Sequence, residues 1–444
     1  MTRNRSSKRC DNEDSNNESP ADKPKSKRIK ISEAAKKVVP VPAKKPTVNV
    51  LRTLSDLSFQ GWSPGRFSHG HKNLKLAAMN HVNKLRVVKG YRPFDRRITF
   101  MTWHPKKPTV LAVGSKGGDI IFWDYNEPKH EHMINGQGPG GSIQAMKFDV
   151  VDPSKIYTAS ITGLVCKQDF YGRNTQVFLE TDNKDHWYTS LDVSFTGKVM
   201  LAGDNKGYVR ILSVDGEQIS QIRLHKQKVT HAEFNPREPW LISTASIDHT
   251  VKLWDIRNVK PKPEALHILN HNKPVNSAYF SLAHGNRLLT TDQHSELRIY
   301  EGPLWNHART IAHPHRQFQH LTPIKAYWHP LEDIVIAGRY PDPNFPGYTT
   351  AELRTIDFFD ADTGKILTQI IPHFKNGIIS LNRFDAIGNV MVSGMGWDIL
   401  VWKPFYPDGQ DEKEDDEPTK FKEAETPEHF IKKKRGGGKT KKID

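Results

Sequence analysis

Short stretches of alternating apolar and polar residues recur along residues 98–404, and turn-forming residues separate them. The segments 98–124 and 229–255 share one order: an alternating stretch, a turn with proline, an apolar stretch, small residues, and a stretch ending in Trp-Asp. Alternation with a period of two is typical of β-strands that are buried on one side. The pattern therefore predicts short β-strands and argues against βαβ units.

The same order occurs seven times. Five weaker copies begin at Ser142, Trp187, Val275, Pro323 and Ile378. The 307 residues divide into about 44 per copy, within the roughly 40–45 residues of a WD-repeat blade. Closing such repeats into a ring protects the sheet edges. We therefore predict an all-β fold, a seven-bladed WD-repeat β-propeller over residues 91–404.

The fourth copy carries polar residues at the positions of the usual WD-repeat hydrogen-bond network. His225 precedes Val229 by four residues, Asp248 lies in the turn before the last strand, and Trp254 ends that strand. Buried polar groups of this kind fix a fold when they are all partnered. We expect these side chains to hold the blade together and not to be catalytic.

Residues 48–90 have a helical period instead. Apolar residues recur at Val48, Leu51, Leu54 and Leu57, and again at Leu74, Leu76, Met79, Val82 and Leu85. Ser63–Gly65 separates the two stretches. The pattern predicts a helix-loop-helix before the propeller. It leaves open whether these helices pack on the propeller or project as an arm for a partner.

The two ends have compositions that cannot form a core. Residues 1–47 are rich in Lys, Ser, Asn and Pro, and residues 405–444 change from acidic to basic. We predict that both are disordered tails. A basic run typical of nuclear import signals predicts a nuclear protein, although a solvated tail is the alternative. Its cations are Lys23, Lys25, Lys27, Arg28 and Lys30.

The net charge of +15 is not confined to the tails. Residues 1–47 carry +7 and residues 405–444 carry −1, so residues 48–404 carry +9. A basic fold favours a polyanionic partner such as nucleic acid. Charge that serves solubility alone is the alternative.

Several classes of protein are disfavoured. Two Cys in 444 residues cannot form a disulfide scaffold, and no Cys/His spacing fits zinc. No apolar run reaches the roughly 20 residues of a membrane span, and the N-terminus lacks a secretory signal. Nucleophile-elbow, P-loop and HExxH motifs are absent. We expect a protein of a reducing compartment that is not an enzyme, binds no cofactor or metal and contacts no membrane.

Two local patterns bear on that expectation. The glycine-rich segment 114–119 lies between two strand patterns, so we interpret it as a hairpin turn. His313 and His315 lie in a loop broken by proline, without carboxylates at a ligand spacing.

The connection between the fifth and sixth copies, residues 301–323, is the longest departure from the repeat. Phe318 lies there among basic and polar residues. The ring could simply cap its own loop. Alternatively it could enter a base stack from the minor groove, which costs least where the duplex is damaged. Such a wedge would select deformable DNA without reading its sequence.

Several strings go beyond the general repeat pattern: FDRR, WHPKKPTVLAVGSKGGDI, HKQKVTH, TASIDHTVKLWDIR, LLTTDQHSELRIY, HPHRQFQHLTPIKA, GRYPDPNF and ELRTIDFFD. Together they resemble the family of the small, WD-repeat subunit of the UV-damaged DNA-binding complex, over residues 48–404. The resemblance implies a damage sensor of nucleotide excision repair that binds photodimers and other helix-distorting lesions. It also implies association with nucleosomes and histones in chromatin.

The resemblance assigns residues to DNA binding. Phe318, Gln319 and His320 match the family's damage-probing hairpin, which enters the minor groove while the photodimer is flipped into a shallow pocket. The positions implied to contact the DNA backbone or to line the lesion pocket are Arg96, Lys116, Trp187, Lys228, His315, Arg316, Arg339 and Tyr340.

A second resemblance concerns a protein partner. IDHTVKLWDIR is similar to the WDxR box of substrate receptors for cullin-RING ubiquitin ligases, whereas the first copy has Asn126 at the Arg position. The implied partners are the large β-propeller adaptor of the complex and, through it, cullin and RING subunits. The implied adaptor-binding residues are Leu51, Arg52 and Leu54 in the first helix and Asp248, Trp254, Asp255 and Arg257 in the box.

Two other functions remain in competition. A chromatin propeller that binds histone or peptide ligands would favour acidic rim pockets, which a fold with a charge of +9 does not favour. A propeller enzyme or lectin would need a constellation of residues that the sequence lacks.

Overall fold

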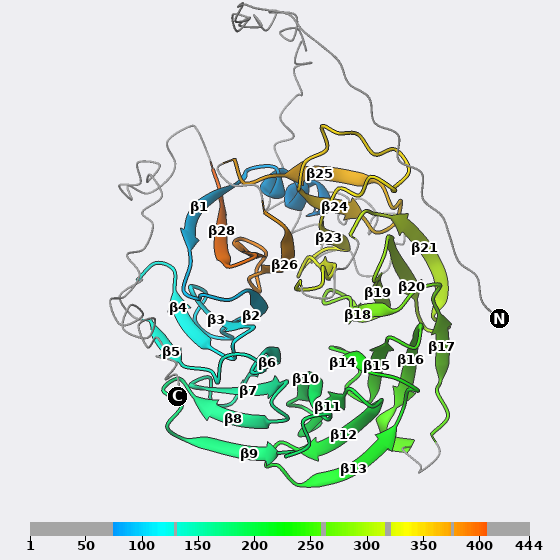
Figure 1. Cartoon of the computed structure of the whole chain (residues 1–444). Coiled ribbons are helices and arrows are strands. Elements are labelled where there is room, and N and C mark those ends of the chain that lie inside the picture. The colour runs from blue at the N-terminus through cyan, green and yellow to red at the C-terminus, as the bar shows by residue number, and fades with distance from the viewer. Residues whose placement is uncertain (1–73, 128–130, 259–262, 316–320, 374–376, 406–444) are drawn as a thin grey trace, which may run out of the picture. The chain divides into compact units, whose positions relative to one another are not determined.

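The computed structural model describes residues 74–127, 131–258, 263–315, 321–373 and 377–405. All of them belong to one compact unit, residues 50–444. The described residues form seven four-stranded antiparallel sheets. Figure 1 shows these sheets as blades around a common centre. The structure therefore confirms the predicted seven-bladed, all-β propeller.

The strands of each blade run in order from the innermost to the outermost. Blade 1 contains β2 (Ile98–Trp103), β3 (Val110–Ser115), β4 (Ile120–Asp124) and β5 (His132–Ile134). Blade 2 contains β6 (Ile143–Phe148), β7 (Lys155–Ser160), β8 (Val165–Asp169) and β9 (Thr175–Leu179). Blade 3 contains β10 (Tyr188–Ser194), β11 (Val199–Asp204), β12 (Tyr208–Ser213) and β13 (Gln218–Arg223). Blade 4 contains β14 (Val229–Phe234), β15 (Leu241–Ser246), β16 (Thr250–Asp255) and β17 (His267–Asn270), with the 3-10 helix η2 (Ile256–Asn258) after β16.

The remaining blades follow in the same order. Blade 5 contains β18 (Val275–Phe280), β19 (Arg287–Asp292), β20 (Glu296–Glu301) and β21 (Asn306–Ala312). Blade 6 contains β22 (Tyr327–Trp328), β23 (Ile334–Gly338), β24 (Ile356–Asp360) and β25 (Ile366–Ile370). Blade 7 contains β26 (Ile379–Phe384), β27 (Met391–Met395), β28 (Asp398–Pro404) and β1 (Leu85–Tyr91).

Strand β1 closes the ring by pairing with β28, so the seventh blade joins the two ends of the propeller sequence. The helix that precedes it covers residues 74–82 and ends before Leu85. The expectation that the helical pattern includes Leu85 is therefore wrong. Leu85 is fully buried, and the free edge of β28 offers backbone partners that local helical periodicity cannot reveal. The propeller thus begins six residues before residue 91.

Two further local interpretations are tested by the strands. The glycine-rich segment 114–119 contains the end of β3 and the turn between β3 and β4 (residues 116–119), as predicted. The connection 301–323 is not one long loop, because β21 occupies Asn306–Ala312 and pairs with β20. The side chains of β21 are mostly exposed, so its sequence has no apolar alternation that would indicate a strand.

Neighbouring strands run in opposite directions, so the connections fall on two rims. We call one the inter-blade rim: it carries the connections between blades and the turns between the second and third strands. The opposite rim carries the connections between first and second strands and between third and fourth strands. Among the described residues of these segments, the inter-blade rim carries 12 Lys and Arg and 8 Asp and Glu, whereas the opposite rim carries 7 and 12. The positive charge is thus concentrated on the inter-blade rim.

The predicted polar network of blade 4 is present. Trp254 Nε1 donates to Thr244 Oγ1 at 2.8 Å, and His225 Nε2 lies 2.8 Å from the same oxygen. His225 Nδ1 lies 3.0 Å from Asp248 Oδ2. Burial lowers the pKa of His225, so the imidazole is neutral at pH 7. The network therefore joins two strands, the connection before β14 and a turn through uncharged donors and one carboxylate.

Replacing Asp248 by alanine should lower the free energy of unfolding by about 2–3 kcal/mol, because buried donors lose their acceptor. Asp248 accepts hydrogen bonds from His225, from the Lys226 amide and from Thr250. Chemical denaturation measures the change. Asp215→Ala, at an exposed turn residue, is the matched control. Equal stability of the two variants would contradict a structural role for this network.

Candidate nucleic-acid interface

The residues predicted to bind DNA lie in connections of one rim. Arg96 precedes β2, Lys116 lies between β3 and β4, and Trp187 precedes β10. Lys228 precedes β14, and Tyr340 lies between β23 and β24. All of these segments belong to the inter-blade rim. The fold therefore brings residues from four blades, far apart in sequence, onto one basic surface.

On blade 1, Arg96 lies against the turn that follows Lys116. The Lys116 amide donates to the Arg97 carbonyl at 2.7 Å, which fixes the two segments together. A Cβ atom at Gly117 would lie 2.8 Å from Arg96 Cδ, so glycine leaves room for the arginine to cross the turn. The Lys116 side chain is exposed and that of Arg96 is 38% exposed. Both cations can therefore reach a phosphate.

Trp187 and Lys228 lie at the starts of blades 3 and 4. Trp187 is held by two hydrogen bonds with Asn205, at 3.1 Å each. The carbonyl of Lys228 accepts from the Ile247 amide at 3.2 Å. The Lys228 side chain is partly buried, and burial lowers its pKa. A partly desolvated cation of this kind gains more electrostatic free energy on pairing with an anion than an exposed cation does.

The proposed wedge, Phe318, Gln319 and His320, lies outside the described residues, as does Arg316. The described residues on its two sides are fixed. His315 Nε2 lies 3.2 Å from Asp292 Oδ1 of blade 5. Thr322 Oγ1 donates to the Ile98 carbonyl of blade 1 at 2.6 Å. The segment that carries the wedge is therefore attached to two separate blades on the inter-blade rim.

His313 and His315 differ from their predicted description. Both are fully buried, and His313 Nε2 lies 3.4 Å from Asp357 Oδ2 of blade 6. The expectation that they lack carboxylate partners is wrong, because the fold brings Asp292 and Asp357 to them from other strands. Burial lowers the pKa of His313 to about 4. The buried position of His315 assigns it to anchoring the segment, and its side chain is not available to DNA in this arrangement.

Arg339 and Tyr340 are both among the positions predicted to contact the DNA backbone or to line the lesion pocket. Arg339 Nε donates to Asp357 Oδ2 at 2.7 Å, and Arg339 also pairs with Glu352. His313 holds the pKa of Asp357 well below its usual range, and this guanidinium adds to the effect. Arg339 is thus engaged with carboxylates. The Tyr340 amide donates to the Pro314 carbonyl at 2.9 Å, which places Tyr340 beside the wedge segment.

Two residues of this rim were missed by sequence reasoning. Trp397 is 43% exposed in the two-residue turn between β27 and β28. The Arg92 guanidinium lies 5.2 Å from its ring centroid and pairs with Asp398 at 2.9 Å. Gly396 accepts from the Ile98 amide, so this pair adjoins Arg96. A large aromatic residue in so short a turn was the signal available in the sequence.

The residues predicted to bind an adaptor separate into two groups. Arg257 follows β16 on the opposite rim, where its side chain is 63% exposed. It forms two hydrogen bonds with Asp255, at 2.9 and 2.7 Å, and lies 4.4 Å from the Trp240 ring centroid. Asp248 and Trp254 are buried in the network of blade 4, and Asp248 lies at the inter-blade end of that blade. Only Asp255 and Arg257 of the box are therefore placed to meet a partner on the opposite rim.

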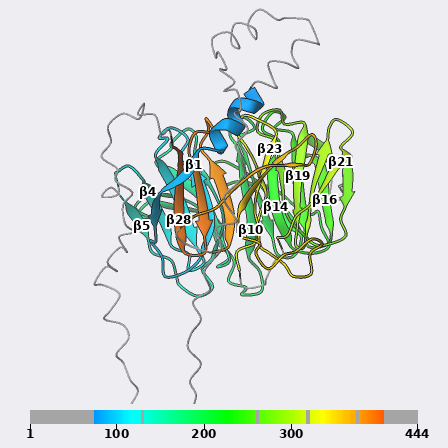
Figure 2. The same ribbon diagram turned by 90° about the horizontal axis from the view of Figure 1, so that it is seen from above.

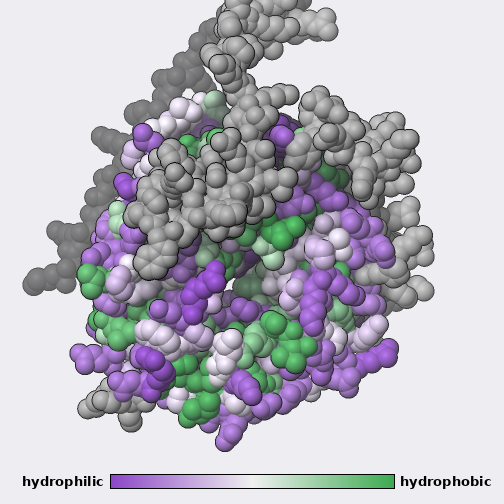
Figure 3. Space-filling view, turned by 180° about the vertical axis from the view of Figure 1, so that it is seen from behind, coloured by the Kyte–Doolittle hydropathy of each residue, from purple (hydrophilic) through white to green (hydrophobic). Residues whose placement is uncertain are grey.

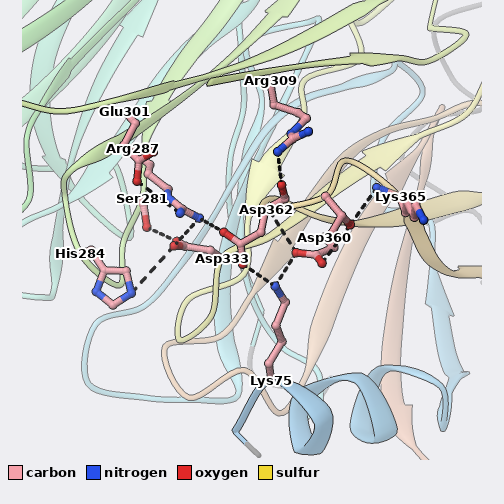
Figure 4. A network of polar contacts seen from close by, with 11 residues as sticks. Lys75, Ser281, His284, Arg287, Glu301, Arg309, Asp333, Asp360, Asp362 and Lys365 are labelled. Atoms are coloured by element: carbon pink, nitrogen blue, oxygen red, sulfur yellow. Dashed lines mark hydrogen bonds and ion pairs between the residues drawn. The ribbon is translucent and has the colours of Figure 1, made fainter. Parts of the chain in front are cut away.

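The helix of residues 74–82 also lies on the opposite rim, and Figure 2 shows it at one face of the ring. Figure 4 shows Lys75 reaching Asp360 and Asp362, with Asp362 Oδ2 at 3.0 Å. Arg287 of blade 5 pairs with Asp362 at 2.8 Å and with Asp333 at 3.0 Å. This network ties the helix to blades 5 and 6.

Apolar contacts add to that attachment. Val82, Ala78 and Met79 pack against the core between blades 6 and 7. Leu74 and Leu76 are 39% and 38% exposed. The described helix thus packs on the propeller and presents two apolar side chains to solvent. Leu51, Arg52 and Leu54 and the basic run of residues 23–30 lie outside the described residues.

Two other kinds of site are absent from the described ranges. No group of three or more His, Cys, Asp or Glu residues there is arranged to hold a metal ion. None of the helices in those ranges has the length and apolar character to cross a membrane.

Comparison with known proteins agrees with the propeller and specifies its family. The family model described as "WD domain, G-beta repeat" matches residues 216–255, which include most of blade 4. The chain is 49% identical over 337 residues to DNA damage-binding protein 2 of Gallus gallus, which covers 74% of this chain and 66% of that protein. It is 47% identical over 334 residues to DNA damage-binding protein 2 of Bos taurus, covering 75% of this chain and 78% of that protein.

The chain belongs to the DNA damage-binding protein 2 family. The family resemblance found in the sequence is thereby confirmed. A plant relative, "Protein DAMAGED DNA-BINDING 2" of Arabidopsis thaliana, is 30% identical over 331 residues, which is 70% of this chain and 58% of that protein. The chain thus spans about two thirds of the length of the Gallus gallus member of the DNA damage-binding protein 2 family.

Proposed function

We propose that this chain recognises damaged double-stranded DNA in nucleotide excision repair and recruits a cullin-RING ubiquitin ligase to damaged chromatin in the nucleus. The observation that carries the proposal is the separation of the two predicted surfaces. The described positions that are predicted to bind DNA lie on the inter-blade rim, whereas Arg257 and the helix of residues 74–82 lie on the opposite rim. One chain can therefore hold DNA and a protein partner at the same time.

Affinity for DNA comes from the basic rim in this proposal. Arg96, Lys116 and Lys228 neutralise phosphates and release counterions, so binding to every duplex weakens with salt. Trp397 and Tyr340 add exposed or partly exposed rings on the same rim. The phosphate contacts position the duplex and carry no information about damage.

Selectivity for damage comes from the segment between His315 and Thr322. Its attachment to blades 5 and 1 lets Phe318, Gln319 and His320 enter the minor groove without moving their supports. Unstacking a base pair costs a few kcal/mol and less at a lesion, where stacking is already impaired. The protein therefore favours damaged sites through the lower cost of deformation.

Recruitment of the ligase requires no catalytic group in this chain, because ubiquitin transfer belongs to the partner complex. The large β-propeller adaptor would contact Arg257, Asp255 and the helical arm, including Leu51, Arg52 and Leu54. The exposed Leu74 and Leu76 provide apolar surface for the same partner. Cullin and RING subunits would join through the adaptor.

Binding of the purified full chain to one duplex, with and without a single photodimer, tests the proposal directly. The measurement is made at ~50 and ~200 mM salt, a range over which non-specific affinity falls steeply. We expect a preference for the photodimer that persists at the higher salt. Equal, salt-sensitive binding to both duplexes would reject damage recognition and would favour a general basic propeller.

Charge reversal of Lys228 to glutamate should weaken binding to damaged and undamaged duplexes alike, by about tenfold, and should lower the slope of log K against log salt by about 1. The reason is the loss of one phosphate contact at a partly desolvated position. Lys184→Glu, an exposed residue of the same rim in blade 3, is the control. An unchanged salt slope in K228E would place Lys228 away from DNA.

A further inference from the structure

The centre of the ring contains a cavity of about 500 Å³ that the proposed function does not use. Inner strands of all seven blades line it, and so do the connections 104–108 and 385–387. Those two connections belong to the opposite rim, so the cavity extends toward the side away from the proposed DNA surface. Figure 3, which shows the side opposite to the view in Figure 1, has a hollow near its centre. A volume of this size is typical of sites for small molecules.

Most of the charged groups in the cavity wall compensate one another. Lys147 Nζ lies 2.8 Å from Asp192 Oδ1, and this pair carries no net charge. Glu233 accepts a hydrogen bond from the Phe280 amide at 2.8 Å. Burial and the nearby Asp192 raise the pKa of Glu233 to about 8, so its carboxyl is largely uncharged at pH 7. These groups supply no free negative charge to the rest of the wall.

Arg383 is a cation without a carboxylate partner among the described residues. Its guanidinium carbon lies 3.6 Å from the Tyr327 ring centroid and 5.8 Å from that of Phe100. One of its nitrogens donates to Tyr279 Oη at 3.0 Å. The aromatic rings fix the guanidinium in place and leave its charge uncompensated.

Lys325 is the second such cation. Within the described part of the chain, its side chain forms no hydrogen bond or ion pair, and the charges that act on it are those of Arg383 and Lys228. Burial and these two cations lower the pKa of Lys325 to about 8, so most molecules carry the charge at pH 7. Lys325 and Tyr327 are two residues apart on one extended segment, so both side chains face the channel.

Placing two partly buried cations in one cavity costs free energy unless an anion binds between them. Their combined charge matches a dianion, and a guanidinium with an ammonium provides several donors for oxygen atoms. We propose that the central channel binds a small molecule carrying a phosphate group, with Arg383 and Lys325 as its anion-binding residues. The ligand enters from the opposite rim, and the aromatic rings beside Arg383 form one wall of the site.

Titration calorimetry of the full chain with inorganic phosphate, at pH 7 and constant ionic strength in chloride, tests the proposal. We expect saturable binding to one site, at least tenfold tighter than binding of acetate, which carries a single charge. Lys325→Met should weaken phosphate binding at least tenfold, whereas Lys325→Arg should retain it. Lys206→Met, at an exposed lysine in a turn of blade 3, should leave it unchanged.

The outcomes that would overturn the proposal are distinct from those that concern DNA. Absence of saturable phosphate binding, or equal affinity in K325M and wild type, rejects the site. The thermal midpoint of each variant without phosphate shows whether it is folded, and Arg383→Met is interpreted only if that midpoint is retained. Damaged duplex at saturation should not displace phosphate, because phosphate enters the channel from the rim opposite to the proposed DNA surface. Displacement would assign Lys325 to the DNA surface instead.

The pH dependence provides a second readout. Raising the pH from 7 to 9 discharges Lys325 and ionises Glu233, so the cavity loses positive charge. This loss outweighs the conversion of the remaining monoanionic phosphate to the dianion, so phosphate binding should weaken several-fold. Glu233→Gln should reduce this dependence. The other titratable or charged groups that face these residues are Lys147, Asp192, Lys228, His231, Tyr279, Tyr327 and Arg383. Phosphate affinity that is unchanged between pH 7 and 9 would contradict the assignment of Lys325.

Discussion

Replacing Phe318, Gln319 and His320 together by alanine should reduce the preference for damaged over undamaged duplex by about 10- to 100-fold. The variant loses the ring and the polar groups that replace a displaced base pair, which are worth a few kcal/mol at a lesion. Binding to undamaged duplex should persist and remain sensitive to salt, because the rim cations are unchanged. Competition between the two duplexes in one titration measures the ratio directly.

The variant should remain folded, since the supports on each side of the segment are kept. His315 with Asp292 and Thr322 with Ile98 are not altered. Tyr171→Ala is the control, because Tyr171 is an aromatic residue with 59% exposure in a connection of the opposite rim. A triple variant that still discriminates damage as wild type does would reject the wedge. Trp397 and Tyr340 would then be the next residues to test for damage recognition.

Charge reversal of Arg257 to glutamate should abolish copurification of the adaptor, with an affinity loss of about 100-fold, and should leave DNA binding unchanged. The exposed guanidinium is held in one orientation by Asp255 and by the face of Trp240. Glutamate would repel Asp255 and remove the donors that a planar guanidinium presents to a partner. Pull-down of the adaptor and duplex binding, measured on the same preparation, separate the two functions.

Arg237→Glu is the matched control, because Arg237 is an exposed arginine on the same rim and blade. Its side chain donates to the Ala283 carbonyl at 2.9 Å, and the WDxR box does not include it. Persistent adaptor binding in R257E would show that the box serves the structure of blade 4 alone. Loss of adaptor binding in both variants would indicate a general effect of rim charge.

The overall architecture was predictable from the sequence because the patterns that specify each blade lie within one short stretch of chain. Each copy of about 44 residues contains its own alternating strands and turn residues, so the number of blades follows from counting copies. The network of His225, Asp248 and Trp254 was also predictable, since its members lie within one copy and bond in the structure. The helix before the propeller was predicted by its period, although its end was not.

Part of the site was predictable for a different reason. The family resemblance assigned Arg96, Lys116 and Lys228 to DNA, and the alternating direction of strands in a propeller puts their connections on one rim. The burial of His315 and the engagement of Arg339 with carboxylates were not predictable. Both depend on Asp292 and Asp357, which reach the wedge segment from other strands only after blades 5 and 6 have packed.

The sequence by itself thus determined the repeat, the number of blades, the polar network inside one blade and the basic character of the chain. The tertiary structure decided the closure of the ring by β1 and β28 and the separation of charge between the rims. It also decided that Arg383 and Lys325 line the same channel. The paired residues of β1 and β28 lie 308 to 319 positions apart, and Arg383 follows Lys325 by 58 positions. Sequence periodicity describes only residues that are neighbours along the chain. The pairing of sheet edges and the compensation of buried charge depend instead on residues that become neighbours only when the ring closes.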